Sequence, residues 1–307
     1  MQGVLIIDKA AGMTSHDVVA KARRILKERR VGHTGTLDPF ATGVLVVLVG
    51  GATRLAQFLS SSDKEYEAVI RLGFATDTGD VTGQPLEPST EKLEPWSRDE
   101  VETAIAGLRG QIDQVPPMYS AKKQGGKKLY ELARRGQQVE REPARVNISI
   151  FEMTQAVNVF SQNSDGTTDI QVRVVCSAGT YIRTLAEDLG KRLGVGAHLA
   201  ELRRTRAGQF DLQQSLTLEQ LESKVQQDGL ADFIVSPDEA LEFLPQVCLS
   251  SLEVQQTQHG RPLKLSTTTE VLNDAALVRM RDQLGKLIAV GSYDSNTHLL
   301  RPRVVLS

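Results

Sequence analysis

The sequence predicts a two-domain protein of mixed α and β structure, in which a large first domain is followed by a small, β-rich second domain. Three observations favour this class. The chain has 307 residues, whereas single domains commonly run to about 100–200 residues. Segments with strand and helix periodicity follow one another up to about residue 215. After about Pro245 the pattern changes to short strands separated by turns.

The first quarter of the chain contains three predicted strands and one predicted helix. Val4 to Ile7 is a short apolar strand, and Ser15 or Asp17 is suited to cap a helix with an apolar stripe over residues 18–26. Residues 44–49, VLVVLV, form an apolar run typical of a buried strand. Residues 65–73 alternate in polarity, which predicts a half-buried strand with Tyr66 facing the core.

The middle of the chain contains two further predicted helices and a strand. Ser97 and Glu100 form a capping-box pattern that starts a helix ending near Gly110. Residues 169–177 alternate like a strand, and residues 177–194 read as a turn followed by a helix. Arg183 lies in the first turn of that helix, where a positive charge is unfavourable with the helix dipole and needs a compensating anion.

A single carboxylate, Asp38, stands in the segment GHTGTLDPFATG, residues 32–43. Its three glycines permit unusual backbone angles, and Pro39 biases Asp38 away from helical angles, so the segment is predicted to be a shaped loop. Such a carboxylate needs a cation or backbone N–H donors to stay ionised. Arg183 is a good candidate for that cation. An ordinary turn, in which Asp38 bonds only its own backbone, is the alternative.

Several classes of function are disfavoured by composition and motifs. The two cysteines, Cys176 and Cys248, form no C-x-x-C pair and are expected to be buried. The histidines show no metal-ligand spacing, and no phosphate-loop or dinucleotide fingerprint is complete. We therefore expect neither a metal nor a cofactor. The first residues lack a signal-peptide pattern and no apolar run could span a bilayer, so a cytoplasmic protein is expected.

Charge is segregated along the chain although the net charge is only −2. Residues 21–30 carry six bases and one acid, and residues 122–145 carry eight bases and three acids. Residues 216–243 hold seven acids and one base. This distribution predicts a positive face that binds phosphates and an opposite surface that is acidic. Residues 115–130 mix four lysines with two tyrosines, a combination that suits nucleic acid, although a mobile surface loop is the alternative.

Five motifs occur in an order that resembles the TruB family of tRNA pseudouridine-55 synthases. They are GHTGTLDPFATGVL, KEYEAVIRLGFATDTGD, PPMYSAKKQGGKKLYELAR, CSAGTYIRTLAEDLG and LRRTRAG, and the likeness covers about residues 3–215. The resemblance implies an α+β fold with a mixed, largely antiparallel central sheet flanked by helices. It also implies a catalytic domain over 1–240, with an RNA-contacting insertion at 115–145, and a PUA-like RNA-binding domain over 245–307.

The same resemblance assigns roles to residues. Asp38 matches the catalytic aspartate, Tyr66 the aromatic residue stacked on the target base, and Arg183 the partner of Asp38. We expect Arg183 to lower the pKa of Asp38 and hold it ionised as a nucleophile. The hydroxyl of Tyr66 could also act as a base toward the ribose C2′ proton. The reaction isomerises a tRNA uridine to pseudouridine after base flipping, without a cofactor.

RNA-binding positions follow from the resemblance and from the basic stretches. His33 resembles the family histidine that fills the gap left in the T-loop. The remaining candidates for RNA contact are Lys9, Tyr181, Leu202, Lys122, Lys123, Lys127 and Lys128. Relatives usually have proline after the lysine where this chain has Ala10, which leaves the placement of Lys9 open.

Two other functions compete with this interpretation. The chain could bind and refold tRNA, as a chaperone whose modifying activity is secondary or absent. It could also be a phosphate-loop nucleotide enzyme, which would be stabilised by nucleotide. The combination of Asp38, Tyr66 and Arg183 favours catalysis over binding alone. We expect a monomer that acts on the T-stem and T-loop of tRNA and has no membrane partner.

Overall fold

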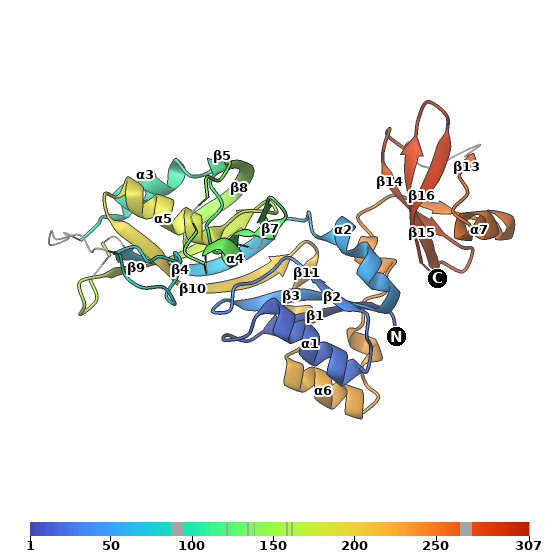
Figure 1. Ribbon diagram of the computed structural model, residues 1–307, viewed down its shortest axis with the longest axis horizontal. Helices are drawn as coiled ribbons and strands as arrows, with labels where there is room; N and C mark the ends of the chain where they lie inside the picture. Colours follow the sequence, from blue (N-terminus) through green and yellow to red (C-terminus); the bar gives the residue numbers. More distant parts are fainter. Residues whose placement is uncertain are drawn as a thin grey trace.

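The computed structural model describes residues 1–86, 95–120, 122–133, 135–137, 139–157, 159–160, 162–264 and 272–306, without the side chains of Lys123, Gln124 and Lys128. Figure 1 shows a long sheet flanked by helices, with a second sheet near the C-terminus. These features confirm the α+β class and the β-rich end of the chain.

Nine strands of the described chain form the large sheet, in the order β1-β3-β10-β4-β9-β8-β5 with β2 on β3 and β11 on β10. All its strand pairs are antiparallel except β3 with β10. The strands are β1 (Gly3–Lys9), β2 (Val31–Thr34), β3 (Thr42–Val49), β4 (Lys64–Gly73), β5 (Gly110–Gln114), β8 (Ala144–Met153), β9 (Thr168–Cys176), β10 (Gly196–Ala207) and β11 (Phe210–Asp211). The sheet is therefore mixed and largely antiparallel, as expected.

Strand β10 joins the two halves of this sheet. It pairs along its length with β4, and its residues Arg203 and Arg204 also pair with β3. Two register shifts interrupt its pairing with β4, and such bulges bend a strand. The segment that carries Asp38 belongs to the β2–β3 half, whereas Arg183 follows β9 in the other half. The junction at β10 is therefore where distant parts of the sequence meet.

Helices cover the two halves separately. Helix α1 (Ser15–Leu26) and α6 (Leu218–Gln226) pack on each other and on β1 and β3 through an apolar cluster that includes Val18, Leu45 and Leu221. Helices α3 (Arg98–Ala106) and α5 (Ile182–Arg192) cover the other half through Ile105, Leu185 and their neighbours. The alternating burial of β4 and β9 supplies the sheet side of that core.

Short elements fill the connections. They are α2 (Ala56–Leu59), α4 (Leu129–Ala133), the hairpin of β6 (Lys123–Gln124) and β7 (Lys127–Lys128), and the 3₁₀ turns Gly50–Leu55, Leu212–Gln214, Ala231–Phe233 and Glu239–Leu241. The basic stretch at 115–130, expected to be irregular, thus contains a small hairpin and the start of a helix.

The second sheet has the order β12-β14-β15-β16-β13. Its strands are β12 (Gln246–Cys248), β13 (Leu263–Lys264), β14 (Leu277–Arg281), β15 (Leu287–Asp294) and β16 (Leu299–Val305), with α7 (Ser251–Gln258) beside them. Leu287, Val290 and Leu306 of this region share an apolar cluster with Leu55, in the 3₁₀ turn after β3, and with Phe58 of α2. The second sheet is therefore packed against the turn and helix that follow β3.

Several local predictions are corrected by the structure. Thr14 caps α1, and Asp17 is the third helical residue of its capping box. Helix α3 ends at Ala106, before Gly110. The segment expected to be a loop from residue 32 begins as strand β2, because residues 31–34 pair with β3. Cys248 is exposed, although Cys176 is buried as expected.

Charge is arranged differently from the expected opposition of a basic and an acidic face. Helix α1 carries the first half of the basic run at 21–30, and α6 belongs to the acidic segment at 216–243, yet the two helices are neighbours. The pKa of Glu219 on α6 is lowered, mainly by hydrogen bonds from its own backbone N–H and from Thr217, and the charge of Lys21 on α1 adds to this lowering. The first basic run is therefore partly offset by acids beside it.

None of the helices in the described part of the chain combines the length and apolar character needed to cross a membrane.

Candidate active site

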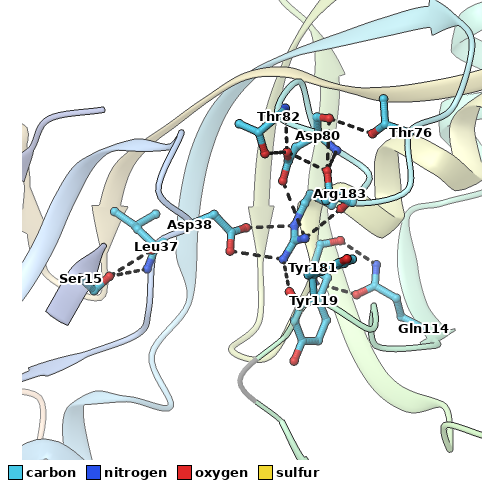
Figure 2. Close-up of polar contacts among 11 residues, drawn as sticks. Ser15, Leu37, Asp38, Thr76, Asp80, Thr82, Gln114, Tyr119, Tyr181 and Arg183 are labelled. Carbon is cyan, nitrogen blue, oxygen red and sulfur yellow. Dashed lines mark hydrogen bonds and ion pairs between the residues drawn. The ribbon is translucent and has the colours of Figure 1, made fainter. Parts of the chain in front are cut away.

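Asp38 and Arg183 form an ion pair at the junction of the two sheet halves, as Figure 2 shows. Arg183 Nε lies 2.9 Å from Asp38 Oδ2 and Arg183 Nη2 lies 3.2 Å from Oδ1. The arginine side chain is only 5% exposed, whereas 33% of the aspartate side chain remains exposed. The two-point contact fixes the plane of the carboxylate while leaving part of it open to a ligand.

The loop that carries Asp38 is held on both sides of the aspartate. Ser15 Oγ accepts a hydrogen bond from Leu37 N at 2.8 Å and donates to Leu37 O at 3.1 Å. Lys9 Nζ donates to Pro39 O at 3.2 Å and also to Ala10 O and Met13 O. The buried Leu37 side chain anchors the turn in the core. Asp38 is therefore presented by a preorganised loop.

Arg183 is held from its own side of the cleft by backbone carbonyls. Its Nη1 donates to Thr78 O at 2.9 Å and its Nη2 to Tyr119 O at 2.7 Å. A second carboxylate, Asp80, lies 3.8 Å from Nη1 and accepts hydrogen bonds from the hydroxyls of Thr78 and Thr82. Arg183 thus stands between two carboxylates, which offsets its unfavourable position in the first turn of α5.

The pKa of Asp38 differs in direction from the sequence-based expectation. Burial in the cleft raises the pKa of this carboxyl above its ordinary value, and the nearby Asp80 raises it further. Arg183 and Lys9 oppose the rise but do not overcome it. Arg183 therefore lowers this pKa as expected, but the net shift is upward, because the depth of the cleft, which desolvates the carboxylate, cannot be inferred from residue types.

Tyr66 lies on β4 and is almost fully buried, with 8% of its surface exposed. Burial raises the pKa of its phenol, and the charge and hydrogen bonding of Arg204 oppose that rise. A tyrosine with a raised pKa stays protonated near neutral pH. The ring can therefore stack on a base, and the hydroxyl is better suited to donate a hydrogen bond than to remove a proton.

A cleft of about 960 Å³ brings most of the candidate residues together. Asp38, Tyr66 and Arg183 line it, and so do His33, Tyr181 and Leu202. These side chains come from β2, β4, β10, the Asp38 loop and the start of α5. The volume lies within the usual range of small-molecule sites, which is about 300–1,000 Å³. One extruded nucleotide therefore fits a space of this size.

His33 is half-buried in β2 at the wall of this cleft. Its Nδ1 atom is buried and has no hydrogen-bond partner in the described structure. Burial and the charge of Arg204 lower the pKa of the imidazole, so the ring is neutral at neutral pH. A neutral ring with an unsatisfied nitrogen is well suited to stack on a base or bond to it.

Lys9 does not line the cleft, and neither do Lys122 and Lys127, the lysines of the 115–145 segment whose side chains the structure describes. Lys9 is 1% exposed, and its ammonium group faces backbone carbonyls instead of solvent. It holds the Asp38 loop and is not placed to contact RNA. Lys122 and Lys127 are exposed, whereas the side chains of Lys123 and Lys128 lie outside the described structure.

Three charged residues of the cleft were not predicted from the sequence: Lys64, Asp80 and Arg204. The signal for Lys64 was its position two residues before Tyr66, which places both on the buried face of β4. Arg204 follows Leu202 by two residues, which places both on the buried face of β10. Because charged residues are seldom fully buried, neither Lys64 nor Arg204 is expected at a buried position from its residue type alone.

No group of three or more His, Cys, Asp or Glu side chains in the described ranges is placed to hold a metal ion.

Comparison with known proteins gives two family matches. Residues 23–182 match the model of the TruB family pseudouridylate synthase N-terminal domain. Residues 183–242 match the model of the tRNA pseudouridylate synthase B C-terminal domain. The matches meet at the first turn of α5, between Ile182 and Arg183, so each contributes one partner of the Asp38–Arg183 pair.

Similar whole proteins and structures support these matches. Two relatives named tRNA pseudouridine synthase B, from Bacillus thuringiensis and Stutzerimonas stutzeri, are each 41% identical over 100% of this chain and over 97% and 96% of their own lengths. A chain of a Cbf5-Nop10-Gar1 complex is 28% identical, with a TM-score of 0.75 over 99% of this chain and 85% of its own. A chain of an H/ACA ribonucleoprotein bound to a substrate RNA containing 2′-deoxyuridine is 27% identical, with a TM-score of 0.73 over 99% and 85%.

Proposed function

The chain belongs to the TruB family of pseudouridylate synthases, and from that membership we propose that it converts uridine 55 in the T-loop of tRNA to pseudouridine. The isomerisation of an RNA uridine is the reaction of the family. The observation that carries the assignment to this site is the convergence of Asp38, Tyr66 and Arg183 on one cleft.

Asp38 is proposed as the nucleophile. Its carboxylate is oriented by Arg183 and keeps an exposed edge toward the cleft. The ionised form has to be present for attack, and the guanidinium favours that form against the effect of burial. Tyr66 stacks on the extruded base, which is worth about 1–3 kcal/mol per base. Nothing is added to or removed from the substrate.

Binding of the RNA involves residues around and beyond the cleft. His33 enters the space that the target base leaves, and Tyr181 and Leu202 form part of the wall against which the flipped nucleotide packs. Lys122, Lys123, Lys127 and Lys128 of the 115–145 segment contact phosphates. These roles rest on position and on the family resemblance.

The proposed domain division places catalysis in residues 1–240 and a PUA-like RNA-binding domain in residues 245–307. All residues that line the cleft precede Gln246, where the first strand of the second sheet begins. We propose that the protein acts in the cytoplasm as a monomer.

The test compares three RNAs with the wild-type protein: a tRNA transcript, the same transcript with cytidine at position 55, and an isolated T-stem and T-loop. Pseudouridine is mapped chemically at each position. We expect conversion at position 55 of the tRNA and of the stem-loop, and none in the cytidine transcript. Conversion at another uridine would contradict the proposed position, and tRNA refolding without conversion would favour the chaperone function.

A further inference from the structure

Two buried cations adjoin Tyr66 without a carboxylate partner. Lys64 and Arg204 line the cleft, but only 7% and 1% of their surfaces are exposed. Within the described ranges neither of them takes part in a salt bridge. An unpaired buried charge is costly, and cleft residues of this kind are candidates for function.

Strand pairing fixes the two cations beside the tyrosine. Arg204 of β10 stands directly opposite Tyr66 of β4, and Lys64 precedes Tyr66 by two residues on the same face. Arg204 Nε donates to Val44 O at 2.7 Å and its Nη2 donates to Gly35 O at 2.9 Å. Lys64 Nζ donates to the carbonyl oxygens of Ser60 and Ser62. Both charges are therefore held in fixed positions by backbone carbonyls.

These contacts make a direct role in phosphate binding unsuitable. A phosphate of the RNA backbone would have to reach side chains that are nearly inaccessible and already bonded to carbonyls. Arg204 and Tyr66 are cross-strand partners on one face of the sheet, and Arg204 counteracts the burial that raises the pKa of the Tyr66 phenol. Since a guanidinium can only donate, the tyrosine hydroxyl accepts toward Arg204 and is free to turn its own hydrogen toward the cleft. The two cations can thus act on a ligand through Tyr66.

Charge in the cleft is segregated. Its two carboxylates, Asp38 and Asp80, adjoin Arg183, whereas Lys64 and Arg204 adjoin Tyr66. A uridine with its ribose at Asp38 and its base at Tyr66 lies along this charge separation. When the bond between the ribose and the base breaks, electrons move from the sugar to the base. The movement is toward Lys64 and Arg204 and away from the two carboxylates, which is the direction that these charges favour.

We propose that Lys64 and Arg204 stabilise, through the Tyr66 hydroxyl, the negative charge that the uracil ring acquires when it leaves the ribose. The inference rests on the proposed function. The N1–C1′ bond breaks with its electron pair on the uracil, spread over N1, O2 and O4. C1′ bonds to an Asp38 oxygen, or forms a double bond to C2′ as the C2′ proton leaves. The charge disappears when C5 bonds to C1′, as the C1′–Asp38 bond breaks or as C2′ regains its proton. The C5 hydrogen then leaves as a proton, and N1 gains one.

The test uses leaving groups of different basicity. T-loop RNA with uridine at the target position is compared with RNA carrying 5-fluorouridine, whose electron-withdrawing fluorine stabilises the uracil anion. Disappearance of the target nucleoside is followed in single turnovers with wild type, Lys64→Met and Arg204→Gln. With uridine we expect losses of about 10²-fold, as for removal of one anion-stabilising donor. With 5-fluorouridine the losses should shrink by about tenfold, because the anion needs less stabilisation.

The controls separate charge from structure. Arg206→Gln removes another arginine of β10, one that pairs with Glu65, and should affect both RNAs equally and slightly. Arg204→Lys and Lys64→Arg keep the charge and should restore the rate with uridine to within about tenfold of wild type. Equal losses on the two RNAs, or an Arg204→Lys rate as low as that of Arg204→Gln, would overturn the inference. If Arg204→Gln does not fold, Lys64→Met with both RNAs decides. Failure of the wild type to convert uridine contradicts the proposed function instead.

Discussion

At the scale of single residues, the cleft holds Asp38 between opposing influences on its pKa. Burial and Asp80 raise the pKa of the carboxyl, whereas Arg183 and Lys9 lower it. A nucleophilic carboxylate must be ionised, so activity is present above this pKa and is lost as pH falls through it. The acid limb of the pH profile therefore reports how well Arg183 counteracts burial.

The substitution Arg183→Gln tests this balance. Without the guanidinium the pKa of Asp38 rises further, so the acid limb of the single-turnover rate should move upward, by about 1–3 pH units if the pair is typical. The rate at neutral pH should fall accordingly. Arg173→Gln is the matched control, because Arg173 of β9 pairs with Glu65 and Glu152 of the neighbouring strands and does not line the cleft. An acid limb at the same pH in Arg183→Gln as in wild type would contradict the effect of Arg183 on the pKa of Asp38.

The sequence predicted which residues form the site more readily than it predicted their burial and pKa. Asp38 was visible because a carboxylate among glycines and a proline is unusual, and Arg183 because a cation at a helix start needs an anion. The direction of the Asp38 pKa and the burial of Lys9, Lys64 and Arg204 depend on the depth of the cleft. That depth arises from the meeting of β3, β4 and β10, which no local pattern contains.

At the scale of elements, the Asp38 loop depends on two features: its contacts with α1 and the close approach of β3 to β10. Ser15 is the first helical residue of α1 and bonds both backbone groups of Leu37. Gly43 begins the pairing of β3 with β1 and has a φ of +101°. These two positions connect the geometry of the site to the packing of the sheet.

Ser15→Ala should loosen the loop. The change leaves the buried N–H and C=O groups of Leu37 without their partner, at about 1–3 kcal/mol for an unsatisfied buried group. We expect a lower free energy of unfolding together with a lower single-turnover rate, while the Kd for tRNA is unchanged. Ser149→Ala is the control, since Ser149 donates to Val175 O away from the cleft and should affect stability alone. Equal rates in the two variants would contradict a positioning role for Ser15.

Gly43→Ala should disrupt the junction of β3 with β10. A Cβ at this position would overlap the backbone of Arg204, 2.8 Å from its nitrogen and closer still to its carbonyl oxygen, in a conformation that side chains rarely adopt. We expect a loss of more than about 2–3 kcal/mol in the free energy of unfolding, measured by urea denaturation. Gly110→Ala has a similar φ of +79° but open space around it, and should lose only about 1–2 kcal/mol. Similar losses in both would show that the close approach to Arg204 is unimportant.

Periodicity predicted the strands and amphipathic helices, and it failed where the apolar signal is weak. The alternation of β4 and β9 and the stripe of α5 come directly from burial on one face. Helix α7 was missed because only Thr257 among its residues is buried. Its start was nevertheless encoded, since Ser250 and Glu253 form a capping box.

At the scale of the whole molecule, two sheets share an apolar contact while the cleft belongs to the first alone. The second sheet region carries the exposed residues Arg261, Lys264, Arg301 and Arg303. If these contact tRNA phosphates, they contribute to affinity and leave the chemical step unchanged.

The packing of acidic α6 against basic α1 was not predictable from charge runs, because it is decided by the apolar faces of the two helices.

Replacing those four residues by glutamine should weaken tRNA binding. Each phosphate contact that is lost should reduce the magnitude of the slope of log K against log[salt] by about 0.7–0.9. The dependence of tRNA binding on salt should therefore become shallower. The single-turnover rate at saturating enzyme should remain that of the wild type. Lys224→Gln on α6 is a control expected to change neither. An unchanged salt dependence in the fourfold variant would contradict RNA binding by the second sheet.

The central claim is that Asp38 performs the isomerisation in this cleft. The most direct measurement is single-turnover formation of pseudouridine in a tRNA transcript by wild type and by Asp38→Asn, with the Kd for tRNA measured for both. Asparagine keeps the shape of the side chain but lacks the charge that nucleophilic attack requires. We predict product with wild type, none detectable with Asp38→Asn, and tRNA binding by both. Full turnover by Asp38→Asn would contradict the assignment.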